Sequence, residues 1–134
     1  MDLNLGRKNI SFGWLWILVG ILLGAFMGMF AFNGPLPSPV GDYTSLPRRM
    51  LRLSHIAFIA LAIINILYGH EIDKLRIRNK LKRLGSRFLI WGAILMPTLL
   101  IFAAFFEPAK YLTMVPAGLV IVSLFIMVCG RFKY

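Results

Sequence analysis

The chain is poor in cysteine, in acidic residues and in histidine. Its 134 residues include one cysteine, Cys129, two histidines and five acidic residues. A single cysteine excludes an internal disulfide framework and a cysteine-based zinc site. Near the end of an apolar run, Cys129 is expected to be a small buried hydrophobic residue. The sequence has no nucleotide-binding glycine loop and no paired carboxylate site, so it predicts no metal centre and no enzyme that acts alone.

Apolar residues and basic residues are what the chain has in excess. Hydrophobic residues make up 59% of it, and its mean hydropathy is +0.78. A soluble domain of this size could not bury that much apolar surface, so we expect a single membrane domain over residues 1–134. The formal net charge is +10. Because the basic residues cluster in the breaks between apolar runs, they indicate contact with anionic lipids rather than with nucleic acid.

Four apolar runs have about the length that crosses a hydrocarbon core, over residues 11–32, 48–70, 87–106 and 111–130. The sequence therefore predicts an all-α integral membrane protein with four transmembrane helices in an up-down antiparallel bundle. Basic residues precede the first run as in a signal peptide, but the run is too long for one, and we expect it to be retained. No acidic or basic residue lies centrally in any run, which argues against proton-coupled pumps and exporters.

Two connecting segments have a distinct composition. Residues 33–47 contain four prolines and predict an irregular outer loop, with Ser45 and Pro47 at the start of the next helix. Residues 71–86 are dense in basic residues and carry a narrow apolar stripe. This pattern predicts a short interfacial helix or an extension of the second span. The Gly85–Ser86 pair is then expected to end that helix and to start the third span.

The distribution of lysine and arginine predicts the orientation. The N-terminus, the 71–86 loop and the C-terminus hold most of the positive charge. An even number of spans puts all three on one side, which the positive-inside rule assigns to the cytoplasm. The basic loop and the absence of a transit peptide favour a bacterial inner membrane. Arg48, Arg49 and Arg52 oppose the rule, and they either snorkel to outer headgroups or contact an acidic partner or cofactor carboxylate.

The first two spans contain residues that suit close contact between helices. Gly20, Gly24 and Gly28 form two overlapping GxxxG units, which let another backbone approach one helical face. Packing within the same chain, contact with another chain and a bound lipid or pigment all fit this pattern. Asn65 lies in the middle of the second span. A buried amide needs a partner, so we expect it to bond across helices rather than to bind a substrate.

Both histidines lie on the second span, His55 near its outer end and His70 near its inner end. Fifteen residues of helix separate them by roughly 22 Å, and the two rings point in similar directions. This one helix resembles that of the b-type cytochromes, which hold one haem in each leaflet, and the resemblance implies haem b. No further histidine exists, so a partner chain, a symmetry mate or a methionine would supply the second ligands. Alternatively, His55 bonds at the outer interface and His70 caps the helix.

Arg52 and His55 are also neighbours on one helical face, at positions i and i+3. Together they could bind an anionic or polar group at the outer surface, such as a lipid phosphate, a quinone carbonyl or a haem propionate. The sequence thus leaves three functions open. The one it favours is a non-catalytic subunit of a larger respiratory, photosynthetic or transport complex, bound to other membrane subunits and without a soluble small-molecule substrate. The alternatives are a haem b electron carrier and a lipid or quinone site.

Overall fold

The computed structural model describes residues 4–29 and 41–132, and this part of the chain is helical. It contains helices α1 (Leu5–Gly28), α2 (Leu46–Ile72), α3 (Asn79–Phe105) and α4 (Met114–Phe132), with a 3₁₀ helix η1 (Glu107–Thr113) before α4. All four spans, with η1 counted as part of the fourth, are long and apolar enough to cross a membrane. The prediction of an all-helical, multi-pass membrane protein is confirmed.

Most of the helix ends lie beyond the ends of the predicted apolar spans. Helix α1 begins at Leu5 rather than at residue 11, and residues 30–32 of the predicted first span lie outside the described residues. So do residues 33–40 of the proline-rich loop. Helix α2 begins where the sequence predicted. The Ser45 hydroxyl accepts a hydrogen bond from the Arg48 amide at 3.5 Å, and Pro47 occupies the first turn.

The segment between α2 and α3 corrects two predictions. Helix α2 ends at Ile72, and α3 already begins at Asn79. The basic segment therefore forms a short turn and the first turns of α3, neither a separate interfacial helix nor an extension of the second span beyond Ile72. Gly85 and Ser86 do not end a helix, because both lie buried inside α3. Their small size serves close packing against other helices, and this packing overrides their low helix propensity.

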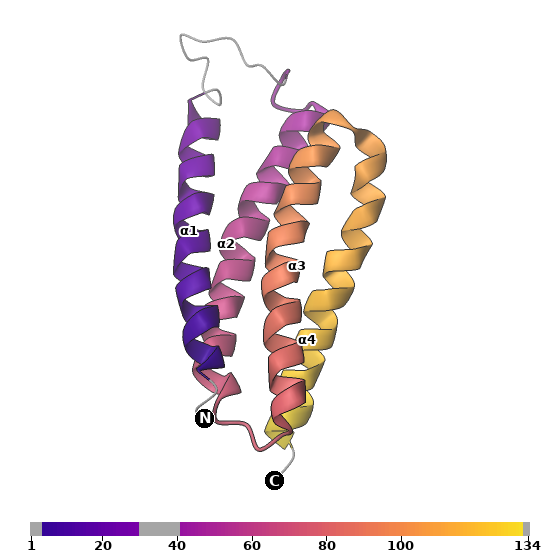
Figure 1. Ribbon diagram of the computed structural model, residues 1–134. Coiled ribbons are helices and arrows are strands. Elements are labelled where there is room, and N and C mark those ends of the chain that lie inside the picture. Colours follow the sequence, from indigo (N-terminus) through magenta and orange to yellow (C-terminus); the bar gives the residue numbers. More distant parts are fainter. Residues whose placement is uncertain (1–3, 30–40, 133–134) are drawn as a thin grey trace.

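The helices pack in chain order (Figure 1). Helix α1 packs against α2, α2 against α3, and α3 against α4, with a smaller contact between α1 and α3. The first described residues of α1 and the last of α4 lie at the same end of the molecule. The small buried residues of the two edge helices recur at intervals of seven, the repeat of two helices that stay in contact over their length. They are Gly6, Gly13 and Gly20 on α1, and Pro116, Ser123 and Gly130 on α4.

A hydrophobic cluster ties the helices together at the end that carries the termini. Leu5, Tyr68, Ile72, Leu75 and Leu89 form it, and they come from α1, α2, the turn after α2, and α3. An ion pair between Arg131 Nη1 and Glu71 Oε2, at 3.1 Å, links α4 to α2 at the same end. Cys129 was expected to be buried but is exposed, whereas the buried residues of α4 are Pro116, Ser123 and Gly130.

Candidate functional site

Three buried polar side chains meet where α1, α2 and α3 pack together. Asn9 Nδ2 donates a hydrogen bond to Asn65 Oδ1 at 2.9 Å, and the Ser86 hydroxyl donates to Asn9 Oδ1. Asn65 also donates to the Leu61 carbonyl of its own helix at 2.9 Å. Asn9 and Asn65 are fully buried, and Ser86 is nearly so. We call Asn9, Asn65 and Ser86 the polar seam. It joins three helices, and because its side chains are shielded from solvent, loss of one would leave a buried polar group without a partner.

A second set of bonds forms around the proline inside α3. Pro97 has no amide hydrogen, so the carbonyl of Ala93, four residues earlier, loses its helical donor. Trp16 of α1 supplies the donor, because its indole Nε1 lies 2.8 Å from that carbonyl. The Trp16 ring stacks on Phe12 and packs against Phe58. The tryptophan is therefore an inward contact between helices.

The glycines of α1 lie in different environments. A Cβ atom on Gly20 would come within 2.8 Å of the Ile59 side chain of α2, and one on Gly24 would overlap the His55 ring. Gly28 has open space around it within the described residues. Gly20 and Gly24 thus face α2 of the same chain, and the close contact continues along Gly13 and Gly6. The seven-residue spacing of Gly6, Gly13 and Gly20 is the signal that a search for GxxxG units misses.

His55 is half-buried and bonds to α1. Its Nδ1 lies 2.8 Å from the Gly20 carbonyl, so Nδ1 carries the hydrogen and Nε2 is left without it in the neutral ring. The ring edge with Cε1 lies against the backbone of Gly24. An iron-bound histidine also donates its second ring nitrogen to a carbonyl, so this bond is compatible with a ligand role for Nε2. A haem bound at Nε2 would nevertheless need free space between that nitrogen and α1.

His70 lies in the last turn of α2 and is exposed. The structure does not bring it together with His55, and each ring has its own surroundings. Among the described residues, no group of three or more histidine, cysteine, aspartate or glutamate side chains could hold a metal ion. Haem b binding by His55 or His70 stays a prediction.

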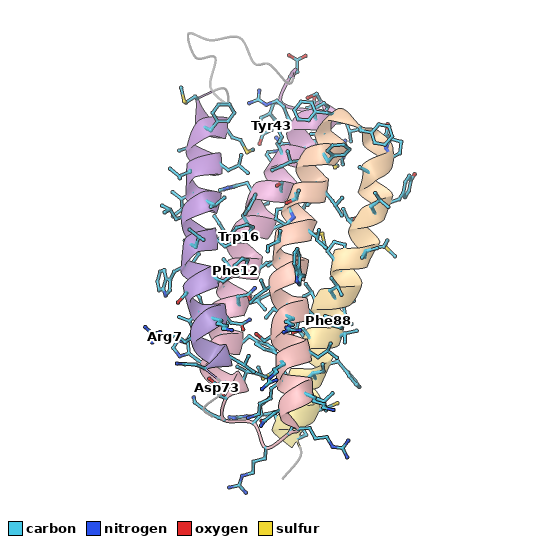
Figure 2. All side chains as sticks on the ribbon, in the orientation of Figure 1. Arg7, Phe12, Trp16, Tyr43, Asp73 and Phe88 are labelled. Carbon is cyan, nitrogen blue, oxygen red and sulfur yellow. The ribbon has the colours of Figure 1, made fainter. Side chains whose placement is uncertain are left out.

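Arg52 points to the end of the molecule opposite the termini. Its guanidinium carbon lies 3.9 Å from the centre of the Tyr43 ring, and Figure 2 shows Tyr43 at that end. Nη1 of Arg52 is buried and makes no hydrogen bond within the described ranges. Arg52 and His55 therefore contact different elements rather than one shared group. The lipid or quinone hypothesis stays a prediction, and it rests on Arg52 more than on His55.

Asp73, directly after α2, holds the start of α1. Its Oδ2 accepts a hydrogen bond from the Gly6 amide at 3.0 Å, and its carbonyl accepts one from Lys82 Nζ at 3.0 Å. A carboxylate at a helix N-terminus pairs with unsatisfied amides and with the positive end of the helix dipole. Asp73 thus supplies the cap that Asn4, in the capping position, does not provide through its side chain.

Comparison of the chain with family models, with curated proteins and with solved structures found no match. The class of protein is accordingly defined by the fold itself. The chain is a multi-pass α-helical membrane protein whose helices are joined by buried polar bonds and close glycine contacts.

Proposed function

We propose that this protein is a non-catalytic accessory subunit of a larger membrane complex. The observation that carries the proposal is the use of its buried polar groups. Asn9, Asn65, Ser86, Ser54 and Ser123 all bond to a neighbouring helix or to one another. Polar groups in a membrane interior are costly unless they serve packing or chemistry, and here packing accounts for them. Such a protein braces or positions other helices rather than converting a substrate.

The two edge helices offer surfaces for such neighbours. Helix α1 packs mainly on α2, and α4 mainly on α3 and η1. Both leave long apolar faces uncovered in the described chain. On α1 this face includes Trp14, Leu18 and Leu22, and on α4 it includes Ile121, Phe125 and Val128. These apolar faces suit lipid tails and the helices of other subunits equally well. A partner helix can therefore replace lipid there without exposing any polar surface of this chain.

Isolation of the tagged protein in mild detergent tests this role. We expect larger membrane proteins to co-purify with it in fixed ratio. Recovery of the partner should fall in one of two matched variants, Leu18→Ala with Leu22→Ala on α1, or Ile121→Ala with Phe125→Ala on α4. The variant on the other edge is the control for folding. Recovery of this chain alone, with mass spectrometry finding no stoichiometric companion, would contradict the accessory role.

We further infer an up-down antiparallel bundle with both ends in the cytoplasm of a bacterium, within its inner membrane. The turn between α2 and α3 and the first turns of α3 carry Lys74, Arg76, Arg78, Lys80, Lys82 and Arg83, and the positive-inside rule assigns that end to the cytoplasm. In a Cys129→Ser background, an impermeant maleimide applied to intact cells should label Asp42→Cys but not Arg76→Cys. Both positions are exposed, so accessibility within the fold is matched. The opposite labelling would reverse the orientation.

A further inference from the structure

A groove runs between α2 and α4 near the end that carries the termini. It has a volume of about 300 Å³ and is lined by Ile64, Leu67, Tyr68, Glu71, Leu124 and Met127. Its walls are apolar over nearly all their surface, since Glu71 is the one charged residue in the lining. Residues 64–71 extend over roughly 10 Å of helix, which suits a narrow, extended occupant.

The groove ends at a cluster of charges. Glu71 pairs with Arg131 at 3.1 Å and with Lys74 at 3.0 Å, so one carboxylate faces two cations. The side chains of Lys74 and Arg131 are 65% and 68% exposed, so both can contact a further anion. Glu71 lines the groove at this end, its mouth, and the two cations beside it make the local charge net positive.

We propose that this groove holds an acyl chain of an anionic phospholipid, whose phosphate is bound by Lys74 and Arg131. The apolar lining offers no hydrogen-bond partner to the backbone of an extended peptide, but it suits a hydrocarbon chain. The cations at the mouth lie where the headgroup of such a lipid would be, and each basic residue near the membrane surface favours anionic lipid. The positive charge at the mouth thus favours an anionic headgroup, and the apolar groove favours a hydrocarbon tail. This inference does not depend on the accessory role.

Native mass spectrometry of the full chain, purified and loaded with equal amounts of phosphatidylglycerol and phosphatidylcholine, tests the proposal. We expect phosphatidylglycerol to be retained preferentially. The preference should fall by about fivefold for each cation removed in Lys74→Gln and Arg131→Gln. Leu124→Trp should fill the groove and abolish the retention, whereas Val122→Trp, at an exposed position of the same helix outside the groove lining, should leave it unchanged.

Helicity and thermal unfolding show whether each variant folds, and Leu67→Trp blocks the same groove from α2 should Leu124→Trp not fold. Equal retention of both lipids by the wild type would overturn the proposal, as would unchanged retention in a folded groove-filling variant. A loss of self-association or of a co-purifying protein in Leu124→Trp, with lipid retention unchanged, would assign the groove to a second copy or to a partner helix and would also overturn it.

Discussion

Replacement of Gly6 by alanine is expected to lower the free energy of unfolding by about 3 kcal/mol. A Cβ atom at this position would overlap the Gly69 carbonyl of α2 and come within 2.8 Å of Asp73 Oδ2. The first of these neighbours is backbone and cannot rotate away, so α1 must move off α2. The movement would also weaken the bond from the Gly6 amide to Asp73. Gly69→Ala should have a similar effect from the other side, since its Cβ would lie 2.5 Å from the Gly6 carbonyl.

Thermal unfolding in detergent, followed by circular dichroism, measures this loss. Gly118→Ala is the matched control, because Gly118 lies within α4 and has open space around it. Alanine is the better helix former by up to about 1 kcal/mol, so the control should be neutral or slightly stabilised. If Gly6→Ala and Gly118→Ala shift the unfolding temperature equally, the close approach of α1 and α2 at Gly6 is wrong.

Replacement of Asn65 by leucine is expected to lower the free energy of unfolding by about 2 kcal/mol. The change removes the acceptor of the Asn9 amide and leaves that amide buried without a partner. Because the Asn9 amide is fully buried, solvent does not reach it to replace the lost bond. The effect should remain below that of Gly6→Ala, because a side chain can reorient where a backbone cannot.

A double-mutant cycle separates the seam from simple packing. If the Asn9–Asn65 bond is the cause, the double variant Asn9→Leu with Asn65→Leu should lose less stability than the sum of the two single variants. Thermal unfolding of all four proteins in the same detergent gives the coupling energy. Strict additivity would show that the two amides do not act as a pair.

The sequence predicts the number and type of elements well, because apolar runs long enough to cross a membrane are unambiguous. It also predicts the start of α2 at Ser45 and Pro47, since a helix cap is a local property. Local signals fail at Gly85 and Ser86. The low helix propensity of the pair predicts a helix boundary. In the structure both residues lie within α3, where their small side chains allow contacts with residues far away in the chain.

The face that each helix presents to its neighbours is harder to predict. In a membrane, lipid tails are as apolar as the protein interior, so a helix that is apolar all round gives no hydrophobic stripe to follow. Small and polar residues remain as the only local guides. Asn65 pointed to a contact between helices, but its partner Asn9 lies 56 residues away, and Ser86, which bonds to Asn9, lies 77 residues from Asn9. Neither pair could be identified from the sequence. Likewise, Arg52 contacts Tyr43 and His55 bonds to Gly20, and neither contact could be predicted from the sequence.

The hydrogen bond from Trp16 of α1 to the Ala93 carbonyl, beside Pro97 of α3, affects how the helices can assemble in the membrane. A hairpin of α3 and α4 inserted without α1 would carry the Ala93 carbonyl unpaired in hydrocarbon, and an unsatisfied backbone group there costs several kcal/mol. The hairpin of α3 and α4 therefore depends on α1 for the hydrogen bonding of its backbone. Helix α1, which precedes α3 in the chain, completes the hydrogen bonding of α3, so we expect the proline in α3 to be tolerated best once α1 is in place.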